Sequence, residues 1–405
     1  MRTFHLNLLL LLPVFCWASV SCQSKENTSD LKPIVDQVVT CKSNQQHSYQ
    51  VFIPSVEKSC KNLPLLVVID PHGDGKLAVS QFRDAAQKYP AVIVGSNLIK
   101  NNDAAYIQEL EELVSDARNR FPVGETLFVG GFSGGARMSI SYAANHRVDG
   151  VIACGALAQP NQIAAVNCPL MAVLGMDDFN FSEAAQFILN PLQMPANLLV
   201  EITNASHSWP EKSLLAQVFG YMQLSASNAF CIRDKEQIIK AYVDGQKNRI
   251  DSLVGEKETI KATMVARNLS HSEQFEKSCY FALLFKKLVQ SETCNAQMNE
   301  LLSSIKFEMK VREDYYNALL QKDSVWWKNE VDGLNSKIET EPNVYTQMAY
   351  KRIKGFLGIV CYSLCNQFLR SNDVSKLEQV LTIYRILEPA NPDMLNFTEE
   401  VQHLK

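Results

Sequence analysis

The segment GGFSGG, residues 130–135, carries a serine in the pattern Gly-x-Ser-x-Gly, formed by Gly131, Ser133 and Gly135. A serine hydroxyl is a weak nucleophile at neutral pH, and it attacks a carbonyl carbon only when a neighbouring base removes its proton. On a strand–turn–helix elbow the serine needs small neighbours, because its backbone is strained and the helix begins close to the strand. The motif is short, so its interpretation as a nucleophile depends on a base and an acid elsewhere in the chain.

Two later segments supply candidates for the base and the acid. Asp177 and Asp178 stand in VLGMDDFNF, and His207 stands in EITNASHSWP, each directly after a run of strand-forming residues. Ligands of a parallel sheet bind beyond the carboxyl ends of its strands, so these groups are expected at one edge with Ser133. The pattern Gly-x-x-Asp favours Asp178 as the acid that orients the imidazole, and Asp177 is the alternative. The same aspartates could instead cap a helix that starts at FSEAA.

A glycine-containing turn, DPHGDG at residues 70–75, follows another expected strand. Attack of a serine on a carbonyl carbon needs backbone N–H groups that stabilise the negative charge developing on the substrate oxygen. The amides of Gly73 or Asp74, together with the amide of Gly134, are the candidates for this oxyanion hole.

Three further residues are candidates for substrate binding, and each has a purely structural alternative. His72 lies in the same turn and could be an ordinary turn residue. Trp209 stands beside His207 and could line the site or simply pack. Arg137 follows Ser133 by one helical turn, where it could attract an anionic group, pair with a carboxylate or point to solvent.

The elements that would position these residues are visible in the first half of the chain, where short β-rich runs alternate with helical periodicity. The later runs are apolar throughout, as expected for parallel strands that are buried on both faces. Strands are expected near 35–41, 48–53, 64–70, 91–96, 126–131, 150–155, 169–175 and 197–202, and helices near 77–88, 103–120 and 134–146.

The composition changes near residue 225, after which glycine and proline are rare and helical periodicity dominates. The second half is therefore expected to be all-helical. Within it, the segment 358–393 resembles a degenerate tetratricopeptide repeat, and a generic helical bundle is the alternative because no second clean copy is evident. Helices are expected near 234–253, 258–270, 273–290, 294–321, 323–335, 344–369, 374–387 and 393–403.

The first 22 residues have the pattern of a secretory signal, with Arg2, a leucine-rich apolar run, small residues and Cys22 at the cleavage point. This resembles a bacterial lipoprotein signal in which Cys22 is lipidated; the alternative is a plain secretory signal cleaved nearby. The expected organisation is a signal over 1–22, a linker over 23–34, an α/β domain over 35–224 and a helical domain over 225–405. The expected location is the periplasm or cell surface of a bacterium, or otherwise the secreted fraction.

The composition argues against several other classes of function. The net charge is −4 and the isoelectric point is about 6.0, so no basic character favours nucleic-acid binding. No spacing of cysteine and histidine indicates a zinc site, so neither a metal nor a cofactor is expected. Charges interrupt the apolar stretches of the second half, so membrane contact is expected only through the lipid anchor.

Taken together, PHGDG, GGFSGGA, GMDDFNF and SHSWP occur in an order that resembles the α/β-hydrolases over about residues 35–222. The similarity is to the branch of dienelactone-hydrolase-like, feruloyl-esterase-like and polyester-depolymerase-like enzymes. It implies an α/β-hydrolase fold with a mostly parallel eight-stranded sheet and a Ser133–His207–Asp178 triad. Dienelactone hydrolases use cysteine as the nucleophile, so Ser133 favours the esterase-like side.

The resulting hypothesis is an exported serine hydrolase that cleaves a small or oligomeric carboxylic ester without a cofactor. One alternative is a scaffold lipoprotein whose hydrolase-like platform is inactive and whose helical domain binds a protein partner. The other is a serine peptidase of the same fold, because a serine triad also cleaves amides.

Overall fold

The computed structural model describes residues 33–56, 60, 62–226, 234–276 and 278–404. The expected signal sequence with Cys22, and residues 23–32 of the expected linker, lie outside the described residues. Within the described part of the chain, every helix is too short or too polar to cross a membrane.

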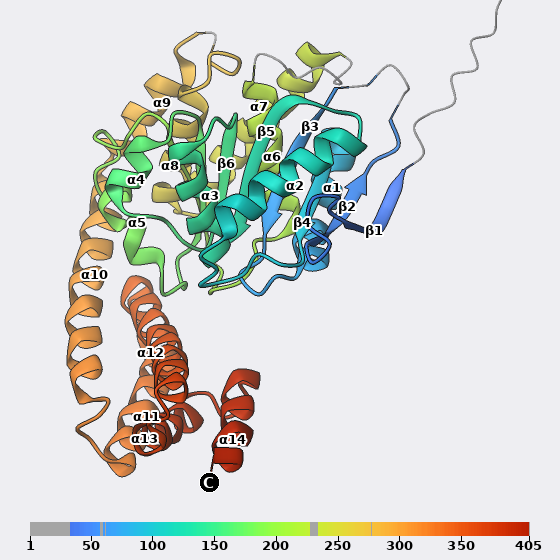
Figure 1. Ribbon diagram of the computed structural model, residues 1–405. Coiled ribbons are helices and arrows are strands. Elements are labelled where there is room, and N and C mark those ends of the chain that lie inside the picture. Colours follow the sequence, from blue (N-terminus) through green and yellow to red (C-terminus); the bar gives the residue numbers. More distant parts are fainter. Residues whose placement is uncertain (1–32, 57–59, 61, 227–233, 277, 405) are drawn as a thin grey trace, which may run out of the picture.

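Among the residues that the structure describes, eight strands form a single sheet in the order β1-β2-β4-β3-β5-β6-β7-β8 (Figure 1). The pairs β1–β2 and β2–β4 are antiparallel, and all the other neighbouring strands are parallel. This confirms the predicted α/β-hydrolase architecture with its mostly parallel eight-stranded sheet. The strands are β1 Ile34–Thr40, β2 Ser48–Ile53, β3 Leu63–Ile69, β4 Val92–Ser96, β5 Val123–Phe132, β6 Gly150–Cys154, β7 Leu170–Gly175 and β8 Leu198–Thr203.

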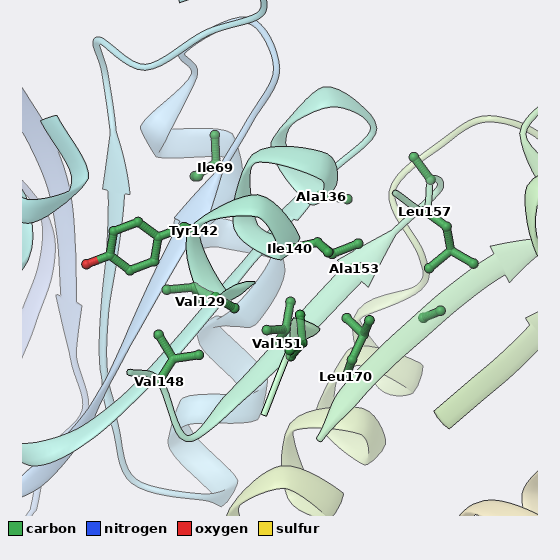
Figure 2. Close-up of a cluster of buried hydrophobic side chains, with 14 of the residues drawn as sticks. Ile69, Val129, Ala136, Ile140, Tyr142, Val148, Val151, Ala153, Leu157 and Leu170 are labelled. Carbon is green, nitrogen blue, oxygen red and sulfur yellow. The ribbon is translucent and has the colours of Figure 1, made fainter. Parts of the chain in front are cut away.

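Helices cover both faces of this sheet, which explains why the central strands are apolar at every position. In β3, Leu65 and Val67 face the layer that contains α2 and α3, while Leu66 and Val68 face the layer that contains α1 and α6. Figure 2 shows the first of these layers, where side chains of β5, β6 and β7 meet those of α3. The helices of this half are α1 Gly75–Lys88, α2 Tyr106–Arg120, α3 Gly134–Asn145, α4 Pro160–Ala165, α5 Phe181–Ile188 and α6 Lys212–Ser225.

Two of these helices were not predicted from the sequence. Helix α4 has only six residues, which is too short for a periodic pattern. Helix α6 buries almost every residue from Val218 to Leu224 between the sheet, α1 and α7, so it lacks the polar face that identifies an amphipathic helix.

The eight helices predicted for the second half are all present. Helix α9 begins later than expected, because Cys279 adopts a left-handed conformation with φ of 55° that a right-handed helix cannot continue through. The bounds are α7 Lys235–Gly255, α8 Thr259–Ser270, α9 Tyr280–Val289, α10 Glu292–Ala318, α11 Ser324–Thr340, α12 Val344–Arg370, α13 Val374–Leu387 and α14 Pro392–Leu404.

Helix α8 packs against the edge strand β8 and protects its free side. The side chain of Asn268 accepts a hydrogen bond from the N–H of Val200 at 3.0 Å and donates one to the same residue's carbonyl at 2.8 Å. Asn268 thus replaces the neighbouring strand that an edge strand lacks. The change of composition at residue 225 therefore marks the end of the strands, while packing on the sheet continues into α8, on which α9 packs in turn.

The last helices form a separate hydrophobic cluster that includes Trp327, which is fully buried. Figure 1 shows the long helix α10 leading from the α/β part to this cluster, and α12 runs beside it in the same direction. The positions of the repeat-like segment lie within this cluster, as either a repeat or a generic bundle would require. They are Cys365, Phe368, Leu377, Leu381 and Tyr384. The first half of α12 lies at the edge of the sheet where the candidate site residues stand.

Candidate active site

Ser133 stands on the tight turn between β5 and α3. Its backbone has φ of 54° and ψ of −116°, a conformation that residues with a side chain rarely adopt. A Cβ atom on Gly131 or on Gly135 would lie 2.6 or 2.2 Å from the carbonyl oxygen of Ile69 in the adjacent strand β3. The glycines therefore permit a contact between strand and helix that no side chain would allow, and the serine is presented at the carboxyl end of the sheet.

The structure brings Ser133, His207 and Asp178 into one chain of hydrogen bonds. The Nε2 atom of His207 lies 3.0 Å from Oγ of Ser133, and its Nδ1 atom lies 2.9 Å from Oδ2 of Asp178. A carboxylate at Nδ1 favours the tautomer that carries its proton there, which leaves Nε2 free to accept the proton of the serine. Asp178 is 1% exposed, and its other oxygen also accepts the N–H of Asn180 at 2.8 Å.

Asp177, the alternative acid, points away from this chain. Its Oδ2 atom accepts a hydrogen bond from Nζ of Lys351 in α12 at 2.8 Å. Of the two neighbouring carboxylates, Asp178 is thus the one within hydrogen-bonding distance of His207.

The imidazole of His207 is held between two aromatic rings that the sequence analysis did not single out. The ring centroid of Phe132 lies 4.7 Å from that of His207, and the centroid of Phe179 lies 4.3 Å from it. Both residues sit beside a predicted site residue, one before Ser133 and the other after Asp178. Their adjacency was the only available signal, because buried aromatic residues are common throughout such a chain.

The expected oxyanion donors have different surroundings. Gly134 is the first residue of α3, where backbone N–H groups lack acceptors within the helix and the helix dipole favours negative charge. The N–H of Gly73 donates to the carbonyl of Asp70 at 3.1 Å, within its own turn. The carboxylate of Asp74 accepts the N–H of Leu77 and caps α1.

Asn101, in the loop after β4, is a polar residue at the site that the sequence analysis missed. The three atoms nearest to the position of a Cβ on Gly134 all belong to the Asn101 side chain, the closest being Oδ1 at 1.7 Å. The backbone N–H of Asn101 donates to the carbonyl of Pro71 at 2.8 Å, which joins its loop to the turn after β3. A single asparagine in a loop carries no local signal, so only the fold could reveal its place.

A cavity of about 760 Å³ opens between Ser133 and the helical region. Its α/β side includes Ser133, His207, His72 and Asn101. Its opposite side comes from α12, α13 and the segment that follows, and includes Lys351, Lys354, Ile359, Tyr362, Tyr384 and Glu388. Both halves of the chain therefore form the walls of the space in front of Ser133.

Arg137 is engaged within the protein. Its guanidinium group lies 2.5 Å from a carboxylate oxygen of Glu183 and donates to the carbonyl of Leu157 at 3.1 Å. It lines a separate cavity with these two residues. The carboxylate pairing considered as its structural alternative is thus the contact it makes.

The other two candidate substrate contacts differ in position. His72 lines the cavity at Ser133, and its side chain is 75% exposed. The indole N–H of Trp209 donates to Oδ2 of Asp70 at 3.2 Å, and its ring packs 5.3 Å from Phe132. Trp209 thus supports the residues around the site from behind Phe132.

No protein-family model and no curated protein sequence matches this chain. Solved structures with a similar fold include an α/β serine hydrolase homologue from Coxiella burnetii, with 18% identity and a TM-score of 0.37 over 47% of this chain and 98% of that one. Another is an α/β serine hydrolase without a lid from Xanthomonas campestris, with 17% identity and a TM-score of 0.36 over 47% and 95%. A third is Est1E from Butyrivibrio proteoclasticus, with 11% identity and a TM-score of 0.36 over 47% and 97%. The functional argument below therefore depends on the geometry of this chain itself.

The space around each glycine predicts opposite effects on stability for two glycine-to-alanine substitutions, one at the elbow and one in an open helix. Gly135→Ala would place a methyl group against the backbone of β3, and we expect it to lower the free energy of unfolding by about 3 kcal/mol. Gly333→Ala, in α11 with open space around the Cα atom, should raise it by about 0.5–1 kcal/mol through helix propensity. Urea denaturation followed by circular dichroism measures both. Equal stability of the two variants would contradict the close approach at the elbow.

Proposed function

We propose that this protein is a serine hydrolase that cleaves carboxylic esters through an acyl-enzyme intermediate. The observation that carries the proposal is the hydrogen-bond chain from Asp178 through His207 to Ser133, on a strained turn at the carboxyl end of a parallel sheet. Each link has the donor–acceptor distance that general-base activation of a serine requires.

In the proposed acylation step, Oγ of Ser133 attacks the ester carbonyl while Nε2 of His207 takes the hydroxyl proton. The tetrahedral intermediate collapses when the bond to the alcohol oxygen breaks, and His207 returns the proton to that oxygen. Asp178 stays ionised throughout, holds the imidazole in the useful tautomer and stabilises the imidazolium. Water then repeats the sequence on the acyl-enzyme and releases the carboxylic acid and free Ser133.

The negative oxygen of the intermediate needs donors aimed at it before the reaction begins. We assign this role to the N–H of Gly134, and we add the side-chain amide of Asn101, which lies against Gly134. Side-chain amides serve as such donors in other hydrolases. Gly73 and Asp74 remain candidates on the opposite loop, although the Gly73 N–H is bonded to Asp70 in this conformation.

The volume of the cavity supports a substrate of moderate size. At about 760 Å³ it falls within the range of about 300–1,000 Å³ that is typical of small-molecule sites. Apolar and aromatic groups from α12 and α13 line it beside charged ones, which suits an ester with both apolar and polar parts.

The leader sequence motivates a further proposal about location. A chain with this signal would be exported, and lipidation at Cys22 would tether it to a membrane by a polar segment. A tether of this kind leaves the site open to substrates outside the cytoplasm.

Replacing the proposed nucleophile tests the reaction directly. We expect wild-type protein to react with a fluorophosphonate probe and the Ser133→Ala variant to remain unlabelled, with kcat on a p-nitrophenyl ester reduced about 10⁴–10⁶-fold. Ser141→Ala, on the same helix α3, is the matched control and should label like the wild type. An unlabelled wild type would instead favour the scaffold hypothesis, and faster cleavage of a matched p-nitroanilide would favour a peptidase.

The neighbouring aspartates offer a second test with a built-in control. Asp178→Asn should lower kcat about 10⁴-fold, because an amide at Nδ1 stabilises the wrong tautomer of His207. Asp177→Asn removes only the ion pair with Lys351, a partly exposed contact, and should change kcat by less than about ten-fold. Steady-state kinetics on a p-nitrophenyl ester compares them. A larger loss in the Asp177 variant would reverse the assignment of the acid.

The proposed oxyanion role of Asn101 predicts a loss confined to the rate of reaction. Asn101→Ala should lower kcat about 10²-fold with little change in thermal stability, because the residue is exposed and its side chain acts only on the developing charge. Asn97→Ala, in the same loop and also exposed, should retain wild-type kcat. Unchanged kcat in the Asn101 variant would remove its side chain from the oxyanion hole.

A further inference from the structure

Two arginines of the helical region donate hydrogen bonds to the loop that carries Asp178. The Nη1 atom of Arg352, in α12, donates to the carbonyl of Met176 at 2.6 Å. The Nη2 atom of Arg312, in α10, donates to the carbonyl of Phe179 at 2.8 Å. One carbonyl precedes Asp178 in the chain and the other follows it, so the segment that carries Asp178 is hydrogen-bonded to the helical region at both ends.

A buried carboxylate connects the two arginines. Oε2 of Glu308 lies 2.6 Å from Nε of Arg352, and its Oε1 lies 2.5 Å from Nη2 of Arg312. Glu308 and Arg352 are both fully buried. Removing such charges from water is costly, and well-packed apolar residues often hold two helices together at least as well. Helix docking alone therefore does not explain an ion cluster here, whereas the fixed fork of a guanidinium group can hold a carboxylate and a carbonyl in one geometry.

The same helix also supports the ring that packs on the catalytic imidazole. A Cβ atom on Gly355 of α12 would lie 3.2 Å from Cδ1 of Phe179, so the helix backbone lies directly behind this ring. The ring of Phe179 also packs on the imidazole of His207, with 4.3 Å between the two ring centroids. Beside it, Lys351 of α12 holds Asp177 away from His207. Helix α12 thus contacts the residue before the acid and the residue after it.

We propose that Arg352, together with Glu308 and Arg312, is a positioning residue that aligns the carboxylate of Asp178 with Nδ1 of His207. The inference rests on the proposed function of the triad. The loop between β7 and α5 has no regular structure of its own, and a misplacement of about 1 Å can cost about 10² in rate. The helical region thereby completes the catalytic machinery of the α/β part as well as lining its cavity.

The alternative is that the arginines only hold the helical region against the α/β part and have no effect on the position of the Asp178 carboxylate. The two cases differ in how their substitutions combine with loss of the acid. If Arg352 acts through Asp178, its substitution has little left to disturb once Asp178 is replaced, and the two effects are strongly non-additive. If it acts only on docking, the two effects multiply.

A double-mutant cycle on the full chain tests this. We would replace Arg352 and Glu308 together, as Arg352→Met with Glu308→Gln, which removes both fully buried charges and leaves only the partly exposed Arg312. The rate constant for labelling of Ser133 by a fluorophosphonate probe should fall about 10–10²-fold when Asp178 is present. In the Asp178→Asn background the same pair of substitutions should change it by no more than about two-fold. An equal fall in both backgrounds would overturn the proposal.

Arg267 is a matched control for the loss of a buried guanidinium group. Arg267 is also buried, in helix α8. It donates hydrogen bonds to the carbonyl of Leu198 in β8 and to the carbonyl of Met194 before that strand, away from the loop that carries Asp178. Arg267→Met should lower the thermal stability while the folded protein keeps its labelling rate within about two-fold. A loss of labelling as large as that of the Arg352 variant would mean that the effect is general destabilisation.

Two further measurements keep the test decisive if the Arg352–Glu308 variant does not fold. Arg352→Lys retains the charge without the guanidinium fork, so it should fold and still label more slowly than the wild type; wild-type labelling would contradict the need for the fork. Proton NMR can also follow the low-field resonance of the Nδ1–H bonded to Asp178. That signal should weaken or shift in Arg352→Lys and persist in Arg267→Met. An unchanged signal in Arg352→Lys would overturn the positioning role even if labelling is slow.

The NMR measurement also separates this inference from the proposed function. If wild-type protein is not labelled, the hydrolase proposal fails, whereas a low-field signal that depends on Arg352 would still show that the helical region positions the acid. If wild-type protein is labelled and neither signal nor rate responds to Arg352, only the present inference fails.

Discussion

The hydrogen bond between Asp178 and Nδ1 of His207 joins two loops that no strand or helix holds in register. One loop follows β7 and the other follows β8, so the parallel pairing of these strands brings both to the same edge of the sheet. Asp178 is buried, so its carboxylate is shielded from water. In this less polar environment the carboxylate interacts more strongly with the imidazole than it would in water. The turn at Ser133, the aromatic rings around His207 and the arginine contacts on the loop that carries Asp178 all lie next to these two residues.

The helical region packs on the α/β part through α8 and, further along the chain, through α10 and α12. Helix α8 covers the edge strand β8 through Asn268, which satisfies the backbone groups of Val200. Helices α10 and α12 then reach the carboxyl ends of the strands, where Arg312 and Arg352 contact the acid loop. The cavity in front of Ser133 is consequently shared by both halves of the chain. Changes in α12 and α13 could alter substrate selection without changing the proposed triad.

The regular elements could be predicted because each leaves a local pattern in the sequence. Apolar runs identified the central strands, and three-to-four-residue periodicity identified the eight later helices. The pattern failed where burial removed it, as in α6, and where backbone conformation interrupted it, as at Cys279. The places of Ser133, Asp178 and His207 after their strands could also be predicted, since parallel strands deliver such residues to one edge. Their catalytic roles stay a prediction that labelling will decide.

The sequence by itself determined which residues could make the elbow, because only glycine permits the contacts that Gly131 and Gly135 make with β3. It also determined the order of the proposed nucleophile, acid and base along the chain. Only the tertiary structure decided which of Asp177 and Asp178 lies within hydrogen-bonding distance of His207, because adjacent side chains point in different directions and the path of the loop sets which one approaches the imidazole. It alone brought Arg352 to the acid loop, since a contact between distant segments has no local signal in the sequence and arises only when packing places both segments at the same surface.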